Sequence, residues 1–141
     1  MDRPLAIFLH SARYDRIYQA ASLLLTAASL GRKGYLFLFY DALATCVNGR
    51  WDDPEGLLDA PAGARPWVET LRRSFALSDS PSPYEILEMA RAEPGGLTVC
   101  ACSTSTKLLG LDPREVRERV DEIVGHATML DLAADAQILY I

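Results

Sequence analysis

The side chains with the widest chemical range in this chain are three cysteines and two histidines. Cys102 follows the apolar run 97–101 and precedes Ser103, where a helix rich in Ser and Thr is expected to begin. A thiolate is the nucleophilic form of cysteine, and the N–H groups at a helix N-terminus favour it over the thiol. Cys102 is therefore the candidate catalytic residue. The alternative is packing, because a free cysteine often behaves as a small buried apolar residue.

The other two cysteines have weaker claims to chemistry. Cys100 lies inside a predicted strand, where packing is the expected role. Cys46 follows the second predicted strand and is a secondary thiol if that strand neighbours the third. An odd number of cysteines without a secretory signal favours reduced thiols over a disulfide framework. Two residues apart on a strand, Cys100 and Cys102 have α-carbons about 6.6 Å apart, near the disulfide limit, which disfavours a redox pair.

His10 and His126 both fall at the ends of predicted strands. Either imidazole could poise Cys102, and an ordinary hydrogen-bonding role is the alternative for each. The two histidines and the thiol would suffice as three zinc ligands, but their long separations carry no metal-binding signature. We expect neither a metal nor a cofactor.

The elements that must position these residues alternate between strands and helices. Short apolar runs predict strands over 5–10, 35–40, 97–101, 120–124 and 136–141. Apolar spacing, together with cap residues such as Ser82 and Asp112, predicts helices between them. These helices span 14–30, 66–77, 83–92, 103–109, 113–119 and 126–134, and a shorter helical turn covers 41–47.

This order predicts an α/β fold: a three-layer α/β/α domain with a five-stranded, mostly parallel sheet. Residues 1–141 are expected to form a single domain, with a surface excursion over the Gly-, Pro- and Asp-rich segment 48–65. Ligands of such sheets bind beyond the carboxyl ends of the strands. The candidate binding residues around Cys102 are therefore His10, Ser11, Tyr14, Arg16, Asp41, Ser103, Gly125 and His126.

Composition narrows the range of partners. Fourteen Lys and Arg against nineteen Asp and Glu give a net charge of -5 without long runs of like charge, so nucleic acid and anionic membranes are poor partners. No apolar stretch approaches the ~20 residues of a membrane span, and no export signal is apparent, so a cytoplasmic location is expected. The segment after the first predicted strand, from His10 to Arg13, lacks a Gly-rich phosphate loop.

Three segments together resemble the DsrE-like family, which includes sulfur-relay proteins of the DsrEFH and TusBCD types. The first runs from His10-Ser11 through Tyr14-Asp15-Arg16 to an Ala- and Leu-rich helix, and the second is Ala101-Cys102-Ser103-x-Ser105. The third begins at Val124-Gly125 and continues through 127–135 into the last predicted strand. The resemblance implies a DsrEFH-like fold and association into dimers, trimers or hexamers, and it matches Cys102 to the family's sulfur-accepting position.

From the thiol's position and this resemblance, we expect a sulfur-handling protein. Cys102 would carry a persulfide and pass sulfur to or from a partner protein or small thiol, as a carrier or sulfurtransferase. The alternative is a noncatalytic, oligomeric module of DsrE-like fold that binds a small ligand at the strand ends while Cys102 only packs. A peroxide or thiol redox protein is a weaker third possibility, because no resolving partner is apparent.

Overall fold

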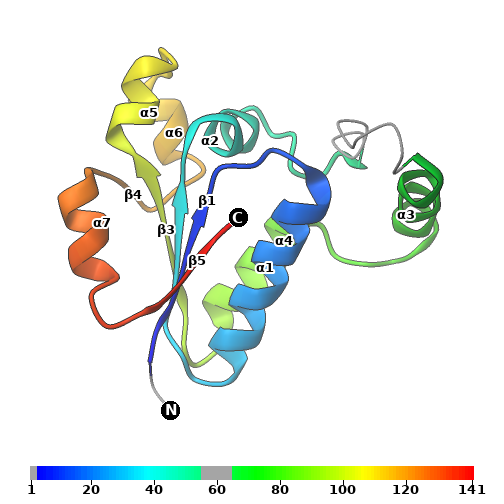
Figure 1. Ribbon diagram of the computed structural model, residues 1–141, viewed down its shortest axis with the longest axis horizontal. Helices are drawn as coiled ribbons and strands as arrows, with labels where there is room; N and C mark the ends of the chain where they lie inside the picture. Colours follow the sequence, from blue (N-terminus) through cyan, green and yellow to red (C-terminus); the bar gives the residue numbers. More distant parts are fainter. Residues whose placement is uncertain (1–2, 55–64) are drawn as a thin grey trace.

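The computed structural model describes residues 3–54 and 65–141, and their strands form one sheet in which every pairing is parallel (Figure 1). The strands are β1 (Leu5–Leu9), β2 (Gly34–Leu38), β3 (Leu97–Cys102), β4 (Glu122–Val124) and β5 (Gln137–Tyr140). Their order across the sheet is β4-β3-β2-β1-β5. The predicted α/β class and five-stranded sheet are confirmed, and the sheet is wholly parallel.

Helices cover both faces of the sheet, which explains why the central strands are apolar at nearly every position. Helices α1 (Tyr14–Ser29) and α4 (Pro83–Ala92) lie on one face, against alternate residues such as Ile7, Leu36 and Val99. Helix α7 (His126–Leu132) lies on the other face, against Phe8 and the residues that share its side. Cys100 and Cys102 belong to this second face, because side chains two apart on a strand point the same way.

Short helices gather at the carboxyl end of the sheet (Figure 1). They are α2 (Tyr40–Val47), α5 (Ser103–Leu108) and α6 (Pro113–Arg117). Asp112 caps α6 by accepting the Arg114 N–H at 2.9 Å, and Ser82 caps α4 by accepting the Glu85 N–H at 3.2 Å. Both caps were predicted from the sequence.

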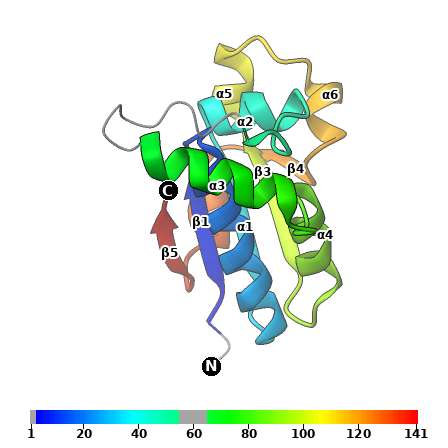
Figure 2. The ribbon, with the colours of Figure 1, turned by 90° about the vertical axis from the view of Figure 1, so that its right-hand side faces the viewer.

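Helix α3 (Arg65–Leu77) lies outside the layer formed by α1 and α4 (Figures 1 and 2). A small cluster attaches it to the start of α1: Tyr14 meets Phe75 edge to face at 4.9 Å, and Tyr18 meets the same ring at 5.0 Å. Val68 completes this cluster as a buried residue.

Trp51 is a buried exception within the predicted surface excursion over residues 48–65. Its indole is buried among core residues of the α1 face, and its Nε1–H donates to the Ala42 carbonyl at 3.2 Å. A single large apolar side chain therefore anchors the segment that follows α2. Positions 55–64 of the predicted excursion lie outside the described residues.

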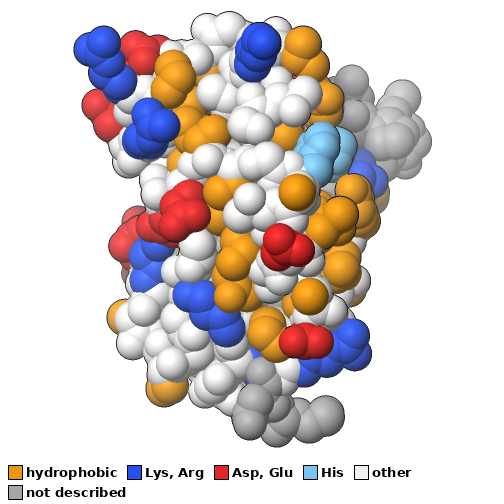
Figure 3. Space-filling view, turned by 90° about the vertical axis from the view of Figure 1, so that its left-hand side faces the viewer, with side chains coloured by type: hydrophobic (Ala, Val, Ile, Leu, Met, Phe, Trp, Pro, Cys, Tyr) orange, Lys and Arg blue, Asp and Glu red, His pale blue; other side chains and the backbone are white. Residues whose placement is uncertain are grey.

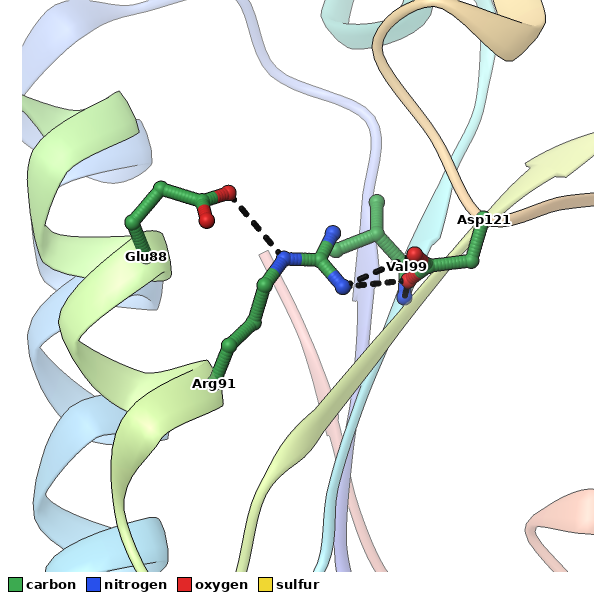
Figure 4. Close-up of polar contacts among 4 residues, drawn as sticks. All are labelled: Glu88, Arg91, Val99 and Asp121. Atoms are coloured by element: carbon green, nitrogen blue, oxygen red, sulfur yellow. Dashed lines mark hydrogen bonds and ion pairs between the residues drawn. The ribbon is translucent and has the colours of Figure 1, made fainter.

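A polar network fixes the β3–β4 edge to α4 (Figure 4). The Asp121 carboxylate accepts the backbone N–H of Val99 at 2.7 Å, and the Asp121 N–H donates to the Val99 carbonyl at 2.9 Å. Arg91 Nη1 lies 2.8 and 2.7 Å from the two Asp121 oxygens, and its Nε donates to Glu88 at 3.1 Å. Since Asp121 immediately precedes β4, this network places the strand that leads to His126.

Within residues 3–54 and 65–141, no helix combines the length and apolar character needed to cross a membrane.

Candidate functional site

The candidate site lies where the chain reverses its direction across the sheet. From β1 to β4, each successive strand is added on the same side of the previous one. The chain then returns through α7 to β5, which lies beside β1 at the other end of the strand order. The connection after β3 packs Val116 of α6 on the α1 face, whereas α7 packs Met129 on the opposite face. Connections that diverge in this way open a ligand-binding position at the carboxyl ends of the strands. Cys102 ends β3, and His126 follows the end of β4 at this point.

Cys102 is the N-cap residue of α5, which begins at Ser103 as the sequence predicted. Its backbone is extended, and its Sγ accepts the N–H of Ser105 at 3.4 Å. The sulfur also lies 3.5 Å from Nε2 of His126. A hydrogen-bond donor and an imidazole therefore both contact the sulfur, and such contacts stabilise a thiolate when the imidazole carries a proton.

The Cys102 side chain is buried, with 1% of its surface exposed. His126, in contrast, is an exposed residue at the start of α7. The three cysteines are free thiols. Among the described residues, no group of three or more His, Cys, Asp or Glu side chains is arranged to hold a metal ion.

Both histidines contact Phe39, but only one of them reaches the thiol. The His10 ring stacks on Phe39 at 4.9 Å, and the His126 ring stacks on Phe39 at 6.3 Å. His10 also contacts the rings of Tyr40 and Tyr140, at 5.9 and 5.8 Å. The structure thus brings His126 to Cys102 and places His10 against the aromatic residues at the ends of β2 and β5.

Tyr40 holds an unusual backbone conformation at this edge. Its φ is +41°, in the left-handed region that residues other than Gly rarely adopt, and it marks the turn from β2 into α2. Backbone strain of this kind is concentrated at functional sites.

An apolar groove opens beside His126. Its volume is about 260 Å³, and its lining residues are Phe8, Phe39, His126, Met129, Leu130 and Tyr140. Apolar side chains are spread over the α7 side of the molecule, with histidine beside them (Figure 3). Leu130 and Tyr140 contribute to this surface with 61% and 71% of their side chains exposed.

The remaining predicted site residues are divided between this edge and other parts of the molecule. Ser103 and Gly125 lie side by side, since a Cβ added to Gly125 would lie 3.8 Å from Ser103 Oγ. Ser11 accepts the Arg13 N–H at 3.1 Å in the turn before α1. Arg16 and Asp41 are exposed.

Tyr14 points away from Cys102. Its ring is buried in the cluster that attaches α3, against Phe75. The structure therefore gives Tyr14 a packing role between helices.

The secondary thiol, Cys46, lies in the core on the α1 face, whereas Cys102 lies on the α7 face. Burial raises the pKa of Cys46 to about 12. Burial likewise raises the pKa of Cys100 to about 11, with a further contribution from Glu122. Both thiols are therefore protonated and unreactive at neutral pH.

Three residues of this region were not among the sequence candidates. Phe39 contacts both histidine rings, Tyr140 lines the groove, and Ser105 supplies the N–H that contacts the thiol. The position of Ser105, three residues after Cys102 and just inside the predicted helix, was a usable signal, because N-cap side chains accept the N–H at that spacing.

The fold and the site define an α/β protein with one thiol at the carboxyl edge of a parallel sheet. No family model matches the chain, and no curated protein is significantly similar to it. Among solved structures, it is similar to MTH1491 of Methanobacterium thermoautotrophicum, a protein of unknown function, at 14% identity and a TM-score of 0.54. The match covers 99% of this chain and 100% of that one. At this identity the likeness shows the fold alone, and membership of the DsrE-like family stays a prediction.

Proposed function

We propose that this protein carries sulfur as a persulfide on Cys102. The contact between Cys102 Sγ and His126 Nε2, at 3.5 Å, is the observation that supports the proposal most directly. The Ser105 N–H on the same sulfur adds support, as does the resemblance to DsrE-like sulfur-relay proteins. Self-association, which that resemblance also implies, stays a prediction.

The chemical step is the transfer of one sulfur atom between thiols. The Cys102 thiolate attacks the outer sulfur of a donor persulfide, R–S–SH, and forms a new S–S bond. The donor S–S bond breaks, and the donor leaves as the thiolate RS⁻. The donor's persulfide proton goes to RS⁻ or to solvent, leaving an anionic persulfide on Cys102. No external oxidant is needed, because the transferred sulfur keeps its oxidation state.

Burial of Cys102 determines how a donor approaches. His126 is exposed, contacts the sulfur and also lines the apolar groove. Rotation of this one side chain would expose Sγ toward the groove, and exposed side chains change rotamer rapidly.

Incubation of the purified protein with a low-molecular-weight persulfide, followed by intact-mass spectrometry, tests the proposal. The wild type is expected to gain one sulfur atom, and Cys102→Ser is expected to gain none. Cys46→Ser and Cys100→Ser are the matched controls and should still gain sulfur, because the Cys46 thiol is buried on the opposite face of the sheet and the Cys100 thiol is buried inside β3. A wild type that gains no sulfur, together with an unreactive Cys102, contradicts the proposal.

The groove favours a second candidate function, that of a noncatalytic module for a small ligand. Among the described residues, its lining contains no Asp, Glu, Lys or Arg, so the ligand would be largely apolar. Titration with a neutral aromatic compound such as indole, followed by NMR, tests this candidate. Under this alternative, Tyr140→Lys abolishes the binding and Cys102→Ser does not change it. Sulfur transfer to Cys102 in the first experiment would favour the carrier function instead.

A further inference from the structure

Ser105 has a buried hydroxyl whose role is unexplained by the fold. The residue is 0% exposed, and its Oγ has no hydrogen-bond partner within the described part of the chain. Its backbone N–H is the group that donates to Cys102 Sγ. A hydroxyl that is buried without a partner destabilises the folded state, so such a group calls for an explanation in chemistry or ligand binding.

The Ser105 hydroxyl belongs to the residue whose backbone N–H contacts the thiol. Side chains of a helix tilt toward its N-terminus, which for α5 is the end at Cys102. Three bonds connect the Ser105 Oγ to the backbone nitrogen that lies 3.4 Å from Sγ. The neighbouring Thr106 hydroxyl is already engaged, since it donates to the Cys102 carbonyl at 2.9 Å. Of these two buried hydroxyls, Ser105 alone keeps its proton available.

We propose that Ser105 is a positioning residue that donates its hydroxyl hydrogen to the outer sulfur of the Cys102 persulfide. This inference rests on the proposed function and extends it to how the carried sulfur is held. The outer sulfur is bonded to Sγ at about 2.05 Å, so rotation about the Cβ–Sγ bond moves it around the Ser105 side of the thiol. A persulfide anion in a buried site is destabilised unless a hydrogen-bond donor contacts it. The neutral thiol requires such a donor less, and in that form the Ser105 hydroxyl stays unpaired.

The test compares the sulfur-transfer equilibrium of wild type and Ser105→Ala. Each protein is equilibrated with a fixed ratio of glutathione persulfide to glutathione, and the sulfur-loaded fraction is measured by intact mass. A hydrogen bond to an anion is strong enough that Ser105→Ala should lower the loading equilibrium constant about tenfold. The matched control is Thr104→Ala, an exposed neighbour on α5, which should load like the wild type.

Thermal unfolding of the sulfur-free proteins supplies a second measurement. Ser105→Ala removes an unpaired buried hydroxyl, so its unfolding temperature should equal or exceed that of the wild type. Lower loading without lower stability supports the proposal, because a purely structural role would not separate the two. Equal loading of wild type and Ser105→Ala overturns the role of Ser105 and leaves sulfur carriage intact. A wild type that takes up no sulfur overturns both.

Discussion

Replacing Asp121 by Ala tests whether the polar network at the β3–β4 edge holds the site together. The substitution leaves the Val99 N–H without its acceptor at 2.7 Å and removes both carboxylate contacts of Arg91 Nη1. Loss of the acceptor for a partly buried N–H costs about 1–3 kcal/mol. The ion pair is 26% and 37% exposed on its two sides, so its loss adds at most about 1 kcal/mol.

The expected loss in the free energy of unfolding is therefore about 1–4 kcal/mol for Asp121→Ala. For a chain of this length, that corresponds to a fall in unfolding temperature of roughly 3–15 °C. Circular dichroism during heating, with urea unfolding as a second method, measures both quantities. Because Asp121 precedes the strand that leads to His126, the same variant should also alkylate faster at Cys102.

Two further variants separate the contribution of the hydrogen bond to Val99 from that of the ion pair with Arg91. Asp121→Asn keeps a side-chain oxygen for the Val99 N–H, and Arg91→Met removes only the ion pair, so each should cost about 1 kcal/mol or less. The proposed role of Asp121 is refuted if Asp121→Asn is as unstable as Asp121→Ala. It is also refuted if the free energy of unfolding of Asp121→Ala lies within about 0.5 kcal/mol of the wild-type value.

Three other predictions concern the thiols and the outer helix. His126→Ala should speed the reaction of Cys102 with iodoacetamide at a pH where the thiol is ionised, because the substitution uncovers the sulfur. His10→Ala, which changes a ring that does not contact the thiol, should leave the rate unchanged. Equal rates in the two variants would exclude His126 as the cover. Burial raises the pKa of Cys46 to about 12 from 9.0, so the folded state keeps a proton that the unfolded state loses, and stability should fall from about pH 9 to about pH 12. Urea unfolding across that range should show a smaller fall for Cys46→Ala, and an identical fall would count against this assignment. Phe75→Ala should speed hydrogen exchange in α3 without changing the sulfur loading of Cys102, since the Phe75 ring contacts Tyr14 and Tyr18 in the outer cluster. Unchanged hydrogen exchange would contradict the anchoring role of Phe75.

The sequence predicted the elements of the fold because local patterns determine them. Apolar runs of five or six residues, such as Leu5–Leu9, correspond to strands covered on both faces, and cap residues such as Ser82 and Asp112 mark helix starts. Cys102 was placed at a strand end before a helix by the same signals, and His126 was placed after the next strand. Helical spacing also indicated the face on which Tyr14 lies. Tyr14 is four residues before Tyr18, so the two side chains share one face of α1, and both pack against Phe75.

Features that depend on distant contacts were not predictable in this way. Trp51 lies among Gly, Pro and Asp residues whose average composition indicates a surface loop, yet one large ring suffices to anchor such a loop in the core. The burial of Cys102 depends on where α5 and α7 pack, and the stacking of both histidines on Phe39 depends on the order of the strands. The left-handed backbone of Tyr40 has no signal in its residue type.

Burial of Cys102 is compatible with sulfur carriage because the two groups on the sulfur differ in mobility. The Ser105 N–H is fixed within the backbone of α5, whereas the His126 imidazole belongs to an exposed side chain at the start of α7. Under the proposed function, an imidazole over Sγ would shield a persulfide from thiols in solution, and its rotation would open the sulfur toward the groove that His126 lines. An exposed cysteine would exchange its sulfur with any thiol that collides with it. A Cys102 persulfide covered by His126 would exchange only with a donor or acceptor that displaces this side chain, which would make the proposed carrier selective.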